Sequence, residues 1–366
     1  MGELGFPKDP AELDAGWFTT ALRGTATIGD DTEVASVRSE QIGQGVGILA
    51  LLWRVHLTYA RGSGPATAVL KLPHTFPESR HIADSFRFYE REVRFYEQAA
   101  TRTPLRTPAR YASSFDDEGG SGDFVLLMED LAGRTVHDQL AGCPGDDAER
   151  DLRALALHHA TWWDSPELPS MPWAVRVADP PNPQALVPAL RQSWPIIESR
   201  FSHLLRGPML KAAERLPDVV VPLMERLSEP PVTLLHGDHR LDNLFFSAHD
   251  VAALDWQITG TGRGAYDVAY FLSQSLVPEL RKELEHDLVR AYHDTLVESG
   301  VTGYPFEACW EDYRLATLFV SVYPLNAGAV DLVNDRAVEL FSAMLDRSVS
   351  AILELDALEL MPASSG

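Results

Sequence analysis

The chain has 366 residues and a formal net charge of −22, from 31 basic and 53 acidic side chains. A nucleic-acid-binding protein needs a basic face, so this charge argues against a nucleic-acid partner, and it disfavours an anionic membrane surface for the same reason. With 45% hydrophobic residues and two cysteines far apart in the sequence, Cys143 and Cys309, the chain can bury a large core without a disulfide framework.

The N-terminal sequence has no basic stretch followed by an apolar run, as a secretory signal would have. The longest uncharged segment, between Arg314 and Asp331, contains Pro324 and Asn326 and falls short of the roughly 20 apolar residues of a membrane-spanning helix. We therefore expect a soluble, cytoplasmic protein with no membrane partner.

The first part of the chain, residues 1–130, has the pattern of a small α+β domain. Residues 10–25 favour a short helix, and residues 81–100 predict a long one because apolar side chains recur there at helical spacing. Four apolar or alternating runs predict strands, at 34–42, 51–59, 67–72 and 124–128.

The second part, residues 131–366, is mostly helical in pattern and is predicted to form a second domain. Over 187–228 we expect two or three helices, separated near Gly207–Pro208 and at Pro217. The other predicted helices cover 148–163, 266–275, 277–299, 306–324 and 333–357. Short apolar runs predict strands at 232–235, 244–246 and 251–254.

The segment most indicative of chemistry is LLHGDHRLDNLFFSAHDVAALDW, residues 234–256. Its predicted strands enclose a polar loop, and a loop followed by a short hairpin can bring Asp238, Asn243 and Asp255 to one edge. A carboxylate and an amide oxygen suit a hard cation such as Mg²⁺, and the other carboxylate can accept a proton from a hydroxyl.

Two other interpretations of this segment stay open. The polar residues could form a turn in which Asp and Asn side chains cap the backbone. Alternatively, His236, Asp238 and His239 could contribute to a zinc site of a hydrolase, although no further histidine lies close by in the sequence.

HGDHRLDN and the following ALDW resemble the catalytic and metal-binding loops of the aminoglycoside phosphotransferase and choline kinase-like superfamily. The wider stretch, through ITGTGRGAYDVAYFL, is most similar to the ecdysteroid-kinase-like branch. The resemblance implies a two-lobed, protein-kinase-like α+β fold. Its small N-terminal lobe would hold an antiparallel sheet and one long helix, and its large C-terminal lobe would be mainly helical.

The resemblance also implies roles for individual residues of the loop region. Asp238 matches the catalytic aspartate, and Asn243 and Asp255 match the Mg²⁺ ligands. His236 matches a histidine that braces the catalytic loop. Asp267 matches an aspartate that ties the next helix back to this loop.

A kinase also needs a cation on the α- and β-phosphates of ATP, held by an acidic partner. Lys71 lies in the apolar run AVLKLP, and the resemblance pairs it with Glu92 in REVRFY. An edge-strand lysine that extends to water is the alternative.

Further nucleotide contacts are implied upstream and downstream of Lys71. Gly43, Gly45 and Gly47 in IGQGVG match a glycine-rich loop whose backbone N–H groups approach phosphate, although a plain β-turn would look the same. FVLLMEDL resembles the strand that leads to the hinge between lobes. Met128 would then border the adenine pocket, and the backbone of Glu129 and Leu131 would bind the purine edge.

Together these features predict an ATP- and Mg²⁺-dependent phosphotransferase that acts on a hydroxyl group of a small molecule. The aromatic and aliphatic content of residues 135–230 favours a fairly apolar alcohol, a steroid-like compound or an antibiotic as acceptor. An aminoglycoside-type antibiotic kinase and a catalytically silent, kinase-like binding protein are the alternatives.

Overall fold

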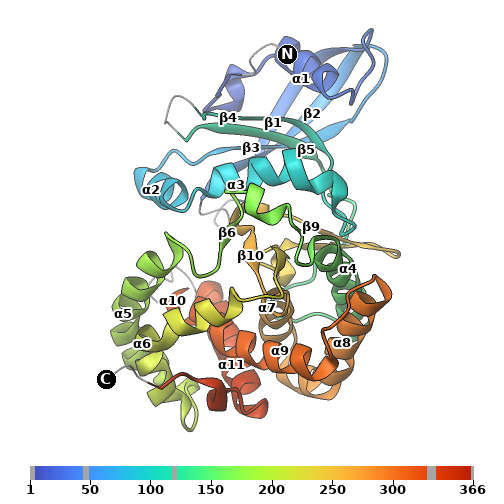
Figure 1. Ribbon diagram of the computed structural model, residues 1–366. Helices are drawn as coiled ribbons and strands as arrows, with labels where there is room; N and C mark the ends of the chain where they lie inside the picture. Colours follow the sequence, from blue (N-terminus) through green and yellow to red (C-terminus); the bar gives the residue numbers. More distant parts are fainter. Residues whose placement is uncertain (1–4, 44–48, 118–121, 328–334, 364–366) are drawn as a thin grey trace. The chain divides into compact units, whose positions relative to one another are not determined.

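A computed structural model of the protein describes residues 5–43, 49–117, 122–327 and 335–363 (Figure 1). The chain divides into two compact units. Unit 1 comprises Met1–Arg102, Thr107–Arg134 and Trp256–Ile258, and unit 2 comprises Thr103–Arg106, Thr135–Asp255 and Thr259–Gly366. Each unit is described by itself below.

Unit 1 is built on a five-stranded sheet of order β1-β2-β3-β5-β4, in which all neighbouring strands are antiparallel. The strands are β1 (Glu33–Ile42), β2 (Ala50–Arg61), β3 (Thr67–Pro73), β4 (Arg110–Phe115) and β5 (Phe124–Glu129). The sequence pattern did not indicate β4, because RYASSF is mostly polar and forms a sheet edge with little need of apolar residues.

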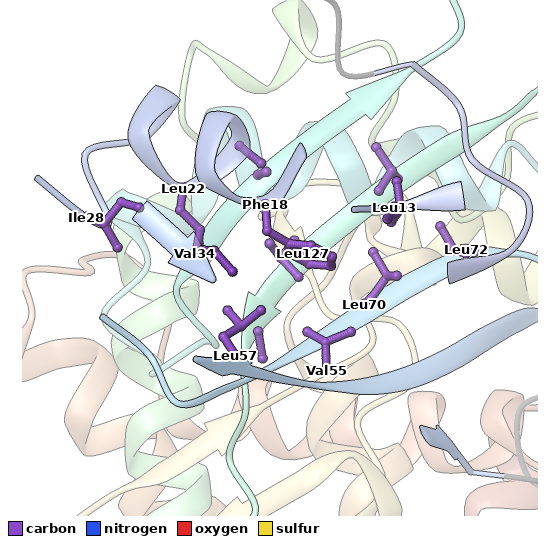
Figure 2. Packing of buried hydrophobic residues seen from close by; sticks show 14 residues of the cluster. Leu13, Phe18, Leu22, Ile28, Val34, Val55, Leu57, Leu70, Leu72 and Leu127 are labelled. Atoms are coloured by element: carbon purple, nitrogen blue, oxygen red, sulfur yellow. The ribbon is translucent and has the colours of Figure 1, made fainter. Parts of the chain in front are cut away.

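Helix α1 (Ala15–Gly24) covers one face of this sheet. The Asp14 side chain caps the helix by accepting a hydrogen bond from the Trp17 N–H. Figure 2 shows Phe18 and Leu22 of the helix packed with Leu70 and Leu127 of the sheet, and all four side chains are fully buried. These side chains belong to the apolar core between α1 and this face of the sheet.

The long helix predicted over 81–100 is wrong as a single element. The segment forms α2 (Pro77–Ser85), α3 (Phe88–Arg94), a π-helical turn (Phe95–Ala99) and a 3-10 turn (Ala100–Arg102). The break lies at Arg87, whose φ of 57° is left-handed, and its guanidinium binds Glu90 one turn later. Apolar spacing continues across the break, so periodicity alone could not reveal it.

Unit 2 is mainly helical (Figure 1). Its helices are α4 (Gly145–Trp162), α5 (Asn182–Phe201), α6 (Met209–Leu227), α7 (Ala265–Ser275), α8 (Pro278–Glu298), α9 (Phe306–Val320), α10 (Val322–Ala327) and α11 (Asp335–Glu354). Its short strands are β6 (Val175–Arg176), β7 (Thr233–Leu235), β8 (Leu244–Phe246), β9 (Val251–Ala253) and β10 (Gly260–Gly262). They form a three-stranded sheet of order β6-β10-β7 and the hairpin β8-β9.

The predicted helix break near Gly207–Pro208 is confirmed, because α6 begins at Met209 and Gly207 has a φ of +56°. The predicted break at Pro217 is wrong. Helix α6 continues through Pro217 and Pro222, and its apolar face, which includes the buried Leu216 and Val220, packs into unit 2. Burial of this face outweighs the hydrogen bonds that the prolines cannot make.

None of the described helices is both long enough and apolar enough to cross a membrane.

We expect the α1 contact to contribute strongly to the stability of unit 1. Leu22→Ala removes a fully buried side chain and should lower the free energy of unfolding by about 2–5 kcal/mol. Leu157→Ala in α4 is the matched control, since Leu157 is 41% exposed, and its effect should stay within about 0.5 kcal/mol. Denaturant titrations of the full chain measure both, and equal losses would contradict the assigned core.

Candidate active site

The polar loop 236–243 connects β7 to β8 in unit 2 and holds Asp238 and Asn243 in direct contact. The amide Nδ2 of Asn243 donates to the Asp238 carboxylate at 2.9 Å and to the Asp238 carbonyl, also at 2.9 Å. Gly237 has a φ of +86°, which a side chain would oppose, so the turn before Asp238 requires glycine. The loop therefore presents a carboxylate and an amide as one hydrogen-bonded pair.

His236 braces this pair, as the resemblance implied. Its Nδ1 accepts the Asp238 N–H at 3.2 Å, so Nε2 carries the proton and donates to the Leu254 carbonyl at 2.8 Å. Burial lowers the pKa of His236, so the ring is neutral and keeps this arrangement. The imidazole of His236 thus connects Asp238, the candidate base, to Leu254, the residue before Asp255.

Asp255 lies two residues after the end of β9 and has a left-handed φ of 62°. The Leu254 N–H donates to the Asn243 carbonyl at 2.9 Å, and Leu244 pairs with Ala253 in the hairpin. The hairpin register therefore brings Asn243 and Asp255 to the same end of β8 and β9. A non-glycine residue at positive φ is uncommon, and such strained residues cluster at functional sites.

Asp267 at the start of α7 fixes the beginning of the loop. Its fully buried carboxylate accepts hydrogen bonds from the backbone N–H groups of His236 (2.7 Å) and Gly237 (2.9 Å) and from Nε2 of His159 (3.2 Å). Burial acts to raise the pKa of Asp267, but the His159 hydrogen bond and the neighbouring imidazoles lower it to about 2. The predicted tie between helix and loop is present.

Sequence reasoning missed a buried pair formed by His239 of the loop and Asp151 of α4. Nε2 of His239 lies 2.8 Å from Oδ2 of Asp151 in α4, and both side chains are fully buried. Burial opposes the charged imidazole, yet Asp151 raises the pKa of His239 above its ordinary value. The apolar spacing of α4 gave no sign that Asp151 points inward.

Sequence reasoning also assigned no role to Arg240 and Tyr270. Nε of Arg240 donates to the Asp238 carboxylate at 3.2 Å, and Nη1 binds Asp242. Burial and the Asp238 carboxylate together raise the pKa of the Tyr270 hydroxyl in α7. Asp238 is therefore oriented by two donors from its own loop, Asn243 and Arg240.

The zinc interpretation does not fit these contacts. His236 and His239 use their Nε2 atoms for Leu254 and Asp151, and both rings are fully buried. Among the residues that the structure describes, no group of three or more His, Cys, Asp or Glu side chains is arranged to hold a metal ion.

In unit 1, Nζ of Lys71 lies 2.6 Å from Oε2 of Glu92, and both side chains are buried. The edge-strand interpretation of Lys71 is wrong. Strand β3 lies between β2 and β5, with Lys71 opposite Leu52 and Leu126. The ion pair implied by the resemblance is thus present, and its role in nucleotide binding remains a prediction.

Strand alternation places the other candidate nucleotide contacts around Lys71. Leu70 and Leu127 face α1, so Lys71, Leu126 and Met128 lie on the opposite face. Gly43 (φ +66°) approaches this face, because a Cβ added there would lie 3.4 Å from Leu52. Gly45 and Gly47 lie outside the described residues.

The hinge segment after β5 is held within unit 1. The Glu129 N–H donates to the Ala109 carbonyl at 2.9 Å. Nε of Arg54 donates to Asp130 at 2.7 Å, and the Leu131 carbonyl accepts from the Arg134 N–H. The predicted purine contacts of Glu129 and Leu131 remain predictions.

Residues 54–307, more than half of the chain, match the sequence model of the phosphotransferase enzyme family, APH. The chain therefore belongs to this family. The superfamily resemblance is confirmed, whereas membership of the ecdysteroid-kinase-like branch remains a prediction.

Three solved structures share the fold. A candidate aminoglycoside phosphotransferase from Ralstonia eutropha is 16% identical with a TM-score of 0.55, covering 94% of this chain and 98% of that one. Choline kinase from Cryptosporidium parvum is 11% identical with a TM-score of 0.54, covering 94% of this chain and 95% of that one. Plasmodium vivax ethanolamine kinase is 12% identical with a TM-score of 0.51, covering 92% of this chain and 86% of that one. These likenesses confirm the predicted kinase-like α+β fold.

Among curated proteins, the chain is similar to mouse acyl-CoA dehydrogenase family member 10, with 29% identity over a segment that covers 28% of this chain. The chain matches 12% of the length of that much longer protein.

We expect Asp267→Asn to destabilise unit 2, because an amide NH₂ would face N–H donors that now bind a carboxylate. The loss should be about 3 kcal/mol, measured by denaturant unfolding. Since the folded pKa of about 2 lies below the ordinary value, ionised Asp267 stabilises the native state above about pH 4, and this stabilisation is lost as the pH falls towards 2. The variant should lack that part of the acid response, and an unchanged acid unfolding curve would contradict this role.

Proposed function

We propose that the protein transfers the γ-phosphoryl group of ATP to a hydroxyl group of a small-molecule alcohol, with Mg²⁺ as the metal. The observation that carries the proposal is the contact of the Asp238 carboxylate with the Asn243 amide, in a chain of the phosphotransferase family. In a kinase loop this arrangement combines a residue that orients the nucleophile with a ligand for the metal.

Asp238 would act on the acceptor alcohol. Its orientation is set by Asn243 and Arg240, so it can align a hydroxyl for in-line attack. The new O–P bond forms from the alcohol oxygen, the bond between phosphorus and the ADP oxygen breaks, and the hydroxyl proton passes to the Asp238 carboxylate.

The donor atoms of Asn243 and Asp255 fit Mg²⁺. Since Nδ2 of Asn243 is used by Asp238, the amide oxygen is the atom left for a cation, and Asp255 adds a carboxylate at the same end of the hairpin. Mg²⁺ prefers such hard oxygen ligands. When bound, the metal neutralises negative charge on the phosphates.

Lys71 would bind the α- and β-phosphates. Glu92 holds its ammonium on the sheet face that also carries Met128 and is approached by Gly43. A strongly acidic chain needs such local cations to bind a polyanion.

The acceptor is proposed to be a fairly apolar alcohol, such as a steroid-like compound or an antibiotic. Within residues 135–230, this class was suggested by Trp173, Trp194, Phe201, Leu204 and Leu205. Of these, Trp173, Phe201 and Leu205 are buried and serve packing. Trp194 and Leu204 are only half-buried, so these two are the ones that support an apolar acceptor surface. A screen of alcohols and antibiotics for ADP release, followed by mass spectrometry of the products, identifies the acceptor.

We expect Asp238→Ala to retain Mg·ATP binding, measured by calorimetry, and to transfer phosphate on the order of 10²-fold or more slowly. Asp287→Ala is the control, because Asp287 lies in the same unit with a side chain that is 89% exposed, and its turnover should match the unaltered protein. Equal turnover of both variants would remove Asp238 from the mechanism. Mg·ATP binding without transfer to any acceptor would favour the silent binding protein.

A further inference from the structure

Arg240 lies two residues after Asp238, and its part in the proposed reaction has so far been limited to orienting that carboxylate. Its guanidinium is anchored on two sides. Nε donates to Asp238 (3.2 Å to Oδ1 and 3.4 Å to Oδ2), and Nη1 binds the Asp242 carboxylate. Because the two carboxylates bind different nitrogen atoms, they fix both the position and the plane of the guanidinium.

The third nitrogen of the guanidinium, Nη2, takes part in neither of these contacts. Within residues 5–43, 49–117, 122–327 and 335–363, Nη2 has no hydrogen-bond partner, and the Arg240 side chain is 24% exposed. Buried donors that lack partners carry a large desolvation cost, but this donor is accessible and can meet a ligand. It presents two N–H groups beside the carboxylate that is proposed to face the reacting hydroxyl.

Charge supports the same conclusion. Burial acts to lower the pKa of Arg240, but Asp238 and then other neighbours, including Asp242, raise it above its ordinary value, so the side chain stays cationic. Asp238 also accepts a hydrogen bond from Asn243, so Arg240 is not its only donor. A permanently charged, oriented and accessible guanidinium suits a phosphoryl group.

We propose that Arg240 is a further catalytic residue, whose Nη2 donates hydrogen bonds to a non-bridging oxygen of the phosphoryl group during its transfer. This role rests on the proposed function. Arg240 neither gains nor loses a proton in the step, since the hydroxyl proton goes to Asp238 and the ADP oxygen leaves with the electron pair of the broken bond. The guanidinium stabilises charge on the oxygens of the moving group, as arginines do in other phosphoryl transfers.

The test compares Arg240→Ala and Arg240→Lys with Arg191→Ala in the full chain. Arg191 is the matched control, since its side chain is 64% exposed and its partner Asp218 is 59% exposed. Two quantities are measured for each variant, the kcat and KM for ATP with an accepted alcohol, and the trapping of labelled ADP by Mg²⁺ and aluminium fluoride, which imitates the phosphoryl group in transit. Trapping reports the contact without any turnover.

For Arg240→Ala we expect kcat to fall on the order of 10²- to 10³-fold with KM for ATP changed less than about threefold, and trapping to be lost. Arg240→Lys should recover part of both kcat and trapping. The control, Arg191→Ala, should change neither. Asp242→Asn, which keeps the cation but loosens its anchor, should weaken trapping on the order of tenfold. This variant tests the role even if Arg240→Ala fails to fold.

Equal trapping by Arg240→Ala, Asp242→Asn and the unaltered protein would overturn the role of Arg240 and leave the proposed function standing. Failure of the unaltered protein to bind Mg·ATP, to trap ADP and to phosphorylate any alcohol would instead overturn the proposed function, and the role of Arg240 with it.

Discussion

The buried carboxylate of Asp267 is the constraint on which the candidate site depends. A fully buried charge is costly, and here three N–H donors offset the cost, two of them from the backbone at the start of the loop. Because the donors lie at fixed positions, the loop can start in only one conformation. His236 then extends this order to Asp238 on one side and to Leu254, next to Asp255, on the other. The position of the candidate base is thus set from a helix that begins about thirty residues later in the chain.

Carboxylates hold three cations of the acidic chain in a similar way. Glu92 holds Lys71, Asp130 holds Arg54, and Asp238 with Asp242 holds Arg240. Each cation is oriented by a carboxylate, so its charge is partly balanced before any ligand arrives, and its direction is fixed. This arrangement reconciles a net charge of −22 with an anionic substrate, because local geometry, rather than overall charge, selects where phosphate can bind.

Features that depend on local pattern could be predicted from the sequence. Strand β8 matches its predicted range because an apolar run flanks a polar loop, and the contacts of His236, Asp267 and Lys71 followed from a family resemblance. Features set by tertiary contacts could not. The left-handed Arg87 interrupts a periodic segment, Pro217 lies inside a helix whose apolar face is buried, and Asp151 turns inward to meet His239. The orienting role of Arg240 depends on a side-chain direction that spacing does not encode.

Isotope labelling tests the central claim most directly. The protein is incubated with Mg²⁺, the accepted alcohol and ATP that carries ¹⁸O on all γ-phosphoryl oxygens, and the product is analysed by mass spectrometry. The account predicts ADP and a phosphate ester whose three non-bridging oxygens are labelled and whose ester oxygen comes unlabelled from the alcohol. Labelled inorganic phosphate without any ester, across a broad panel of alcohols, would contradict it.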